Sequence, residues 1–347
     1  MRLSLRGDSI LERALLGLGL VPRPALEAWA GLALSSTLIS AAELGVFARL
    51  AREPMTSVAL AEDRGLNADV ADMLLRCLHS TGYLTRRRGA YALSRRTRRW
   101  LDPASPYAVT SFVAACADYQ SWWSRLSDVA AGGAIAEHHA SPADSGYWRR
   151  YLSGQRDLAR LAAGEVARRV PIPDTATRML DIGGGHGWYS AAICGARPHL
   201  ESTIVDLPGS VRIGAELVTP TGLAERIHFV EGNALSAPLG DGYDAVLCFN
   251  VIHHLREPDV RALFARARAA IKPGGVLCVM DAFDDRVANP RPAQAYGSLF
   301  MYLSSGSQIY PHGTVQTMLA EVGFESIRRT PIRRLPETWL YSATVTR

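Results

Sequence analysis

The stretch 181–187 reads Asp-Ile-Gly-Gly-Gly-His-Gly and joins a predicted buried strand to a predicted helix. Glycines at this place let the backbone approach a ligand closely, and Gly183, Gly185 and Gly187 have the spacing Gly-x-Gly-x-Gly. A dinucleotide fingerprint needs a further glycine where Trp188 stands, and the chain has no Gly-Lys-Ser/Thr phosphate loop. The stretch therefore indicates a nucleoside site, unless its glycines serve only a tight turn.

Polar residues also end the next two predicted strands, 202–206 and 227–231. A carboxylate at Asp206 can accept hydrogen bonds from both ribose hydroxyls. Asn233, which precedes Ala234, offers the donor and acceptor atoms that suit an adenine edge. Acidic residues near the glycines, without clustered cations, favour a nucleoside that carries positive charge.

His253 follows a fourth predicted strand, 243–250, and is the candidate general base. A neutral imidazole has an ordinary pKa near 6.5, which suits proton abstraction. Asp281 ends a fifth predicted strand, 276–281, and could orient the ring. The alternative is that His253 packs within the cofactor pocket, and the adjacent His254 is more typical of a structural residue.

Short apolar strands alternate with helices after residue 170, which predicts an α/β, doubly wound, mostly parallel seven-stranded sheet. Two strands, 325–332 and 339–345, should close the sheet as a hairpin. Ahead of it, three predicted helices, the last over 68–80, precede two strands around the turn Arg86–Gly89. This is the winged-helix pattern. Residues 107–170 are predicted to be mostly helical and are rich in aromatics.

The composition is that of a soluble globular protein: 347 residues, 48% hydrophobic and 20% charged, with a net charge of +5. It excludes disordered, collagen-like and coiled-coil chains. The five cysteines lack metal-ligand spacing, so we expect no metal site and a reducing, cytoplasmic setting. We also expect no signal peptide and no apolar run long enough to span a membrane.

Together these residues resemble the class I S-adenosylmethionine-dependent O-methyltransferases of plant phenolic and bacterial secondary metabolism. The resemblance covers nearly the whole chain and is carried by segments 181–187, 205–208, 232–234, 250–253, 272–275 and 323–324. It implies S-adenosyl-L-methionine as cofactor. The residues it implies for cofactor binding are Asp181, Gly183, Gly185 and Gly187 at the methionine end, Asp206 and Leu207 at the ribose, Asn233 and Ala234 at the adenine, and Asn250.

The resemblance also implies His253 as base and Asp281 as the acid that orients it. The family motif His-Asp-Trp is here His253-His254-Leu255, and the stretch 306–311 lacks the family's third acid. These departures leave open a second reaction class with the same fold and cofactor. That class comprises C- or N-methylation and a rearrangement without methyl transfer.

The implied organisation is a winged-helix-like dimerisation domain (1–105), a helical linker and substrate cap (106–170) and a cofactor-binding methyltransferase domain (171–347). The implied partners are a second copy and a small aromatic or polyketide-like acceptor of antibiotic-type biosynthesis, with neither nucleic acid nor membrane. A DNA-binding regulator is the remaining alternative, because arginines cluster over 86–88 and 95–99. The recognition-helix candidate 68–80 speaks against it, since it carries Asp69 and Asp72 and few cations.

Overall fold

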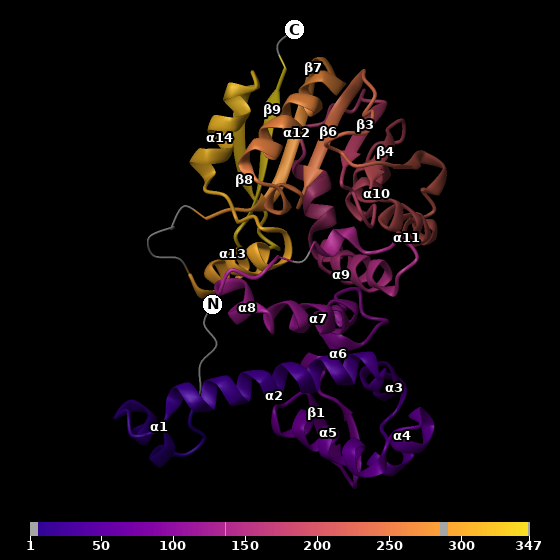
Figure 1. The fold of residues 1–347 in the computed structure, drawn as a ribbon. Coiled ribbons are helices and arrows are strands. Elements are labelled where there is room, and N and C mark those ends of the chain that lie inside the picture. Colours follow the sequence, from indigo (N-terminus) through magenta and orange to yellow (C-terminus); the bar gives the residue numbers. More distant parts are fainter. Residues whose placement is uncertain (1–5, 136, 285–290, 346–347) are drawn as a thin grey trace. The chain divides into compact units, whose positions relative to one another are not determined.

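The computed structural model describes residues 6–135, 137–284 and 291–345. The chain divides into two compact units, Met1–Ala117 and Asp118–Arg347, each with a core of its own (Figure 1). The point of division lies within helix α7 (Thr110–Trp123). The three-part division of the sequence analysis stays a prediction.

Several helices of the first unit begin at polar residues whose side chains accept backbone N–H groups. Thr56 accepts from Ala59 at 3.2 Å, and Asn67 accepts from Val70 at 3.0 Å. The predicted helix over 68–80 is confirmed. The helices are α1 (Ile10–Gly17), α2 (Arg23–Glu43), α3 (Val46–Arg52), α4 (Ser57–Arg64), α5 (Ala68–Ser80) and α6 (Arg95–Leu101).

The predicted hairpin is present as β1 (Leu84–Arg87) and β2 (Ala90–Leu93), which pair antiparallel. Its turn is shorter than expected. Arg88 and Gly89 both have positive φ, 51° and 83°, and this allows a two-residue turn that matches the twist of the strands. The prediction of a four-residue turn over Arg86–Gly89 was therefore wrong, because Arg86 and Arg87 belong to β1.

Helix α2 carries an exposed apolar surface. It is 21 residues long, and by length and composition it is the one helix among the described residues that could cross a membrane. The expectation that no apolar run reaches this length was wrong, because its charges are confined to Arg23, Glu27 and Glu43. Trp29 and Leu32 are 72% and 68% exposed. Such a surface is typical of a contact with another molecule.

The second unit is built on a seven-stranded sheet in the order β5-β4-β3-β6-β7-β9-β8. The first five strands of this order are parallel, and β9 is antiparallel to both β7 and β8. The predicted mostly parallel sheet with its closing hairpin is thus confirmed. The strands are β3 (Arg178–Ile182), β4 (Glu201–Asp206), β5 (Ile227–Glu231), β6 (Tyr243–Phe249), β7 (Ile271–Ala282), β8 (Glu325–Pro331) and β9 (Thr338–Thr344).

Side chains that alternate along the central strands form two cores, one on each face of the sheet. Helices cover both faces (Figure 1). On β3, Leu180 and Ile182 pack with α12 and α14, whereas Met179 packs with α9 and α10. The helices are α8 (Leu126–Ala130), α9 (Gly146–Arg169), α10 (Trp188–Gly195), α11 (Pro208–Val218), α12 (Glu257–Ala270), α13 (Pro292–Ser305) and α14 (His312–Glu321). Single 3₁₀ turns are η1 (His138–Ala140), η2 (Thr219–Thr221), η3 (Ala224–Arg226) and η4 (Ile252–His254).

The sequence predicted a turn over 272–275 before the strand 276–281. In the structure β7 begins earlier, at Ile271, and its register against β6 shifts between the pairs Tyr243–Ile271 and Ala245–Val276. The turn residues therefore bulge from a continuous strand. Lys272 is held there by an ion pair with Asp244.

Strand β3 pairs with β4 on one side and with β6 on the other. The chain thus crosses over in opposite directions after β3 and after β6, and open α/β sheets bind their ligands at the carboxyl ends of such strands. The segments that follow β3, β4, β6 and β7 at this edge contain most of the predicted site residues.

We expect Gly214→Ala to destabilise the protein by about 1–3 kcal/mol, the usual cost of overpacking. A Cβ on Gly214 would lie 2.2 Å from the carbonyl oxygen of Gly185, so the glycine loop itself would have to shift. Urea unfolding of the two proteins measures the difference. Gly195→Ala is the matched control, because its Cβ would meet only Leu223 at 3.5 Å, an ordinary contact. Equal unfolding midpoints for the two variants would contradict the expectation.

Candidate active site

The glycine loop after β3 has the backbone that its residue types predict. Gly183, Gly185 and Gly187 have φ of 67°, 52° and 65°, a region that side chains with a Cβ rarely adopt. The N–H of Gly185 donates to Oδ2 of Asp206 at 2.7 Å. A Cβ on Gly183 would lie 2.7 Å from Val251, so the loops after β3 and β6 approach closely. The loop is therefore fixed by contacts with both neighbouring strands' ends.

Asp181 is the most deeply buried carboxylate beside this loop, with 1% of its surface exposed. Its Oδ2 accepts the Ser190 hydroxyl at 2.6 Å, and its Oδ1 has no hydrogen-bond partner among the described residues. Burial and, to a lesser extent, the nearby charge of Asp206 raise the pKa of Asp181 to about 7, against the lowering effect of the Ser190 hydrogen bond. A positively charged group beside Oδ1 would relieve this strain, so the residue fits a cationic ligand.

Asp206 ends β4, and both of its carboxylate oxygens accept backbone N–H groups. Besides the bond from Gly185, the N–H of Leu207 donates to Oδ1 at 2.7 Å. Burial raises the pKa of Asp206 against the lowering effect of these bonds. Leu207 is also the N-cap residue of α11. Each oxygen has a second lone pair, which leaves acceptor capacity for ligand hydroxyls.

The segment after β5 places Asn233 at the surface. Its Oδ1 accepts the N–H of Leu235 at 2.9 Å, which makes a local turn. The carbonyl of Ala234 accepts the Arg266 guanidinium at 2.8 Å. The Asn233 side chain thus has a structural role in its own loop, and its amide NH₂ is the group left to contact adenine. The adenine role of both residues stays a prediction.

Asn250 follows β6 in a strained backbone conformation. Its φ is 56°, which is uncommon outside glycine and is found in strained segments of functional sites. Its N–H donates to the Met280 carbonyl at 2.7 Å, and its side chain hydrogen-bonds Tyr189. These contacts turn the chain sharply, so that η4 and its two histidines lie above the end of β7.

His253 and Asp281 form the pair expected of a base and its orienting acid. Nδ1 of His253 lies 2.6 Å from Oδ1 of Asp281, whose side chain is 1% exposed, against 12% for His253. The same Oδ1 accepts the N–H of Ala282 at 2.7 Å. An oxygen that accepts a backbone N–H acts as an acceptor towards His253 too, so Nδ1 of His253 donates. The lone pair of the neutral ring therefore lies on Nε2.

The stretch that lacks the family's third acid braces the histidine turn instead. Ser307 and Tyr310 both donate to the carbonyl of Leu255, at 2.5 Å and 2.7 Å, while Gln308 is exposed. The segment therefore fixes the backbone just after His254 through neutral hydrogen bonds.

Sequence reasoning missed two basic groups near the site. Burial lowers the pKa of His186 in the glycine loop to about 3, and the positive charge of Arg156 on α9 is the second cause of this shift. The Nε of Arg156 has no hydrogen-bond partner among the described residues. His139 of η1 packs edge-on against His254, with ring centroids 4.6 Å apart. No spacing rule signals either residue, because both come from segments before the sheet.

An aromatic cluster packs beside this histidine pair within the second unit. Trp122 stacks on Phe300 at 5.4 Å between ring centroids, and Tyr147 stacks on Tyr151 at 5.4 Å. His139 connects the cluster to His254, since its ring lies 5.2 Å from that of Tyr151. The cluster therefore provides flat apolar surfaces close to the candidate base.

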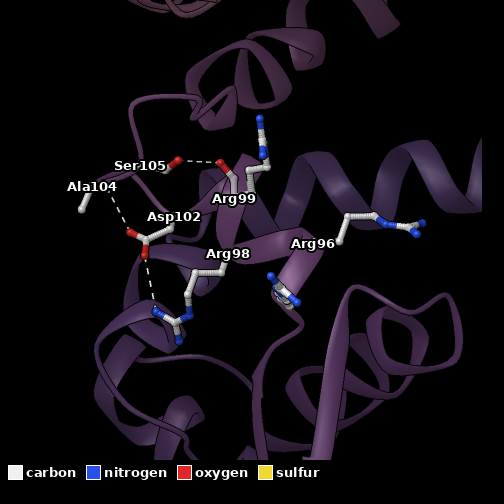
Figure 2. A pocket seen from close by; sticks show the side chains of 7 residues that line it. Arg96, Arg98, Arg99, Asp102, Ala104 and Ser105 are labelled. Atoms are coloured by element: carbon white, nitrogen blue, oxygen red, sulfur yellow. Dashed lines mark hydrogen bonds and ion pairs between the residues drawn. The ribbon is translucent and has the colours of Figure 1, made fainter.

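The arginine cluster of the first unit lines a depression of 740 Å³ on α6 and the residues just after it. Arg98 is paired with Asp102 at 3.4 Å, and Arg99 lies over the ring of Tyr107 at 4.3 Å. Figure 2 shows that the guanidinium groups point in different directions. Within the described part of the chain, no group of three His, Cys, Asp or Glu side chains could hold a metal ion.

Comparison with known proteins gives two family matches. Residues 126–325 match the O-methyltransferase domain, and residues 26–103 match the O-methyltransferase dimerisation domain. The comparisons give no support to a DNA-binding regulator.

Individual relatives agree with these matches. The chain is 26% identical over 305 residues to 3-hydroxy-5-methyl-1-naphthoate 3-O-methyltransferase of Streptomyces sahachiroi, covering 86% of this chain and 88% of that protein. It is 28% identical over 305 residues to mitomycin biosynthesis 6-O-methyltransferase of Streptomyces lavendulae, covering 84% and 85%. Its fold resembles human N-acetylserotonin methyltransferase, solved in complex with SAM, with a TM-score of 0.83 and 20% identity over 99% and 100% of the chains. Because the methyltransferase match alone spans more than half of the sequence, the chain belongs to the O-methyltransferase family and joins its dimerisation domain to its methyltransferase domain.

Proposed function

We propose that this enzyme transfers the methyl group of S-adenosyl-L-methionine to a hydroxyl of an aromatic, polyketide-like acceptor, with His253 as general base. The observation that carries the proposal is the 2.6 Å bond between Nδ1 of His253 and buried Asp281, next to the glycine loop. It leaves the lone pair of the neutral ring on Nε2, the atom that would take the proton of an acceptor hydroxyl. The names of the naphthoate and mitomycin relatives support this acceptor class.

The residues around β3 and β4 fit the cofactor. The bound cofactor supplies a methyl group that is already activated on a sulfonium. Asp181 has the unpaired buried oxygen that a cationic methionine end requires, and the open backbone of Gly183, Gly185 and Gly187 lets that end approach. We assign Asp206 with Leu207 to the ribose, and Asn233 with Ala234 to the adenine. Asn250 completes the pocket at the end of β6.

His253 takes the proton of the acceptor hydroxyl on Nε2 as the new oxygen–carbon bond forms. Asp281 stabilises the resulting imidazolium, because its buried carboxylate already accepts the Nδ1–H. A positioned base contributes roughly 10²- to 10⁴-fold in rate. Alignment of the two reactants can contribute about 7–11 kcal/mol, so the pocket that orients the acceptor contributes more than the base.

The aromatic cluster around Trp122 and Phe300 supports a flat acceptor. The dimerisation domain supports a homodimer as the working form, in which the exposed apolar face of α2 is covered by a second copy. We also keep the division at residues 105 and 170, with the middle segment as the substrate cap. The free cysteines support a reducing cytoplasmic setting.

Cofactor affinity should depend on pH through Asp181. Its raised pKa of about 7 means that it is mostly protonated at pH 6 and ionised at pH 8. The ionised form attracts the cationic cofactor, so we expect the Kd to be roughly tenfold higher at pH 6 than at pH 8. Isothermal titration calorimetry with Asp181→Asn should show weaker binding without this dependence.

In the ligand-free protein, ionisation of Asp181 lowers the stability of the fold, whereas it raises the affinity for the cofactor. Folding raises the pKa of Asp181 from 3.8 to about 7, so the carboxyl contributes its full stability to the folded state below pH 3.8. That contribution is lost as the pH rises through about 7. Ligand-free Asp181→Asn should therefore melt above the wild type at pH 8. Asp174→Asn removes a similar charge from an exposed position before β3 and is the control. A pH-independent Kd in the wild type would refute the assignment.

His253→Gln should bind the cofactor with a Kd within about twofold of the wild type, yet lose roughly 10²- to 10⁴-fold in kcat. The assay follows transfer of a labelled methyl group to 3-hydroxy-5-methyl-1-naphthoate and related phenols, with mass spectrometry of the product. A product heavier by one methylene, on oxygen, is the expected result. Methyl on carbon or nitrogen, or a product of unchanged mass, would support the second reaction class.

The control for this experiment is His228→Gln, an exposed histidine on β5. It should retain wild-type turnover. If His253→Gln also retained it between pH 6 and pH 9, His253 would not be the base.

A further inference from the structure

His254 contacts the very nitrogen on which the proposed reaction depends. Nε2 of His253 lies 3.0 Å from Nε2 of His254, and the two ring centroids are 4.2 Å apart. A hydrogen bond at this distance needs one N–H and one lone pair. The two residues therefore share one proton in the ligand-free enzyme, and its position can be assigned.

The assignment follows from Asp281. Its Oδ1 accepts the N–H of Ala282 at 2.7 Å and is therefore an acceptor towards His253 as well. Nδ1 of His253 must then carry the proton of the neutral ring. Neutral His253 then has its lone pair on Nε2, and His254 must donate from its own Nε2. This leaves Nδ1 of His254 as a bare acceptor. That atom is buried and has no hydrogen-bond partner among the described residues.

His254 cannot hold a second proton. Burial lowers the pKa of His254 well below its ordinary value, and the charges of His253 and His139 lower it further. The other titratable groups near it are Tyr147, whose hydroxyl lies 3.3 Å from Nδ1 of His139, and Tyr151. None of the groups that shift the pKa of His254 within the described part of the chain is an anion, so His254 acts as a neutral donor.

We propose that His254 is a positioning residue that occupies the lone pair of the base until an acceptor hydroxyl replaces it. This rests on the proposed function of His253. The acceptor O–H takes over as donor to Nε2 of His253, and its proton moves there as the oxygen–carbon bond forms and the sulfur–carbon bond breaks. Acceptors that donate a strong hydrogen bond, such as phenols, are selected over weak donors, because they must compete with an imidazole N–H.

The test compares His254→Leu with His254→Gln. Leucine has a similar volume and no donor, whereas glutamine keeps an amide N–H that can reach His253. Diethyl pyrocarbonate acylates a free imidazole nitrogen, and peptide mass spectrometry reads the reaction at His253 in protein without acceptor. We expect the leucine variant to react roughly tenfold faster than the wild type, as the loss of an ordinary hydrogen bond predicts. The glutamine variant should react at the wild-type rate.

Steady-state kinetics with the naphthoate acceptor provide the second measurement. The leucine variant should show a KM for the acceptor lowered by a similar factor, with kcat changed less than about threefold, because only the resting state loses an interaction. A lowered kcat at unchanged KM, or acylation at the wild-type rate, would overturn the proposal.

A third measurement needs no variant. Nitrogen-15 NMR of the wild-type histidines should find Nε2 of His253 unprotonated and Nε2 of His254 protonated, and the reverse pattern would refute the proposal even if His254→Leu failed to fold. Acylation and NMR report the hydrogen bond whether or not His253 is the base. Failure of the base assignment would appear separately, in His253→Gln.

Discussion

Three aspartates lie at the ends of buried parallel strands, and the need to satisfy their charges organises this edge of the sheet. A carboxylate removed from water must be met by N–H groups, hydroxyls or cations. Asp206 is met by two backbone N–H groups. One oxygen of Asp281 is met by Ala282 and the His253 ring, while its Oδ2 has no hydrogen-bond partner among the described residues. Asp181 is met by one hydroxyl only. The first two carboxylates shape loops, and the third is left to attract a ligand.

This difference gives each end of the site its chemistry. At the glycine loop, the buried carboxylate of Asp181 is the group that we propose attracts the cationic end of the cofactor. At β7 the same kind of carboxylate is used to set the tautomer of a histidine. The tautomer directs the lone pair of His253 towards His254. The hydrogen bond to one buried oxygen of Asp281 thus decides the state of the nitrogen on the far side of the ring.

The two basic regions of the chain have different physical settings. The arginines of α6 are exposed and diverge from one another, Arg98 is paired with Asp102, and Arg99 packs on aromatic rings. Their charge is dispersed in solvent, where it contributes little to a specific site. Arg156 lies beside buried His186, and burial lowers the pKa of both His186 and His254. The net charge of the chain was therefore a poor guide to its function.

The sequence alone determined the parallel sheet, the glycine spacing and the strand-terminal acids, since each follows from local rules. Glycines mark positive φ, apolar runs mark buried strands, and Asp206 and Asp281 sit where those runs end. Local rules failed where distant contacts decide. The predicted turn 272–275 lies within strand β7, which pairs with β6. The side chain of Asn233 accepts the N–H of Leu235 in its own loop. Only the tertiary structure placed Nε2 of His254 against Nε2 of His253, with His139 and Arg156 nearby. That arrangement depends on the strained turn at Asn250 and on packing from α9 and η1, which no spacing along the chain records.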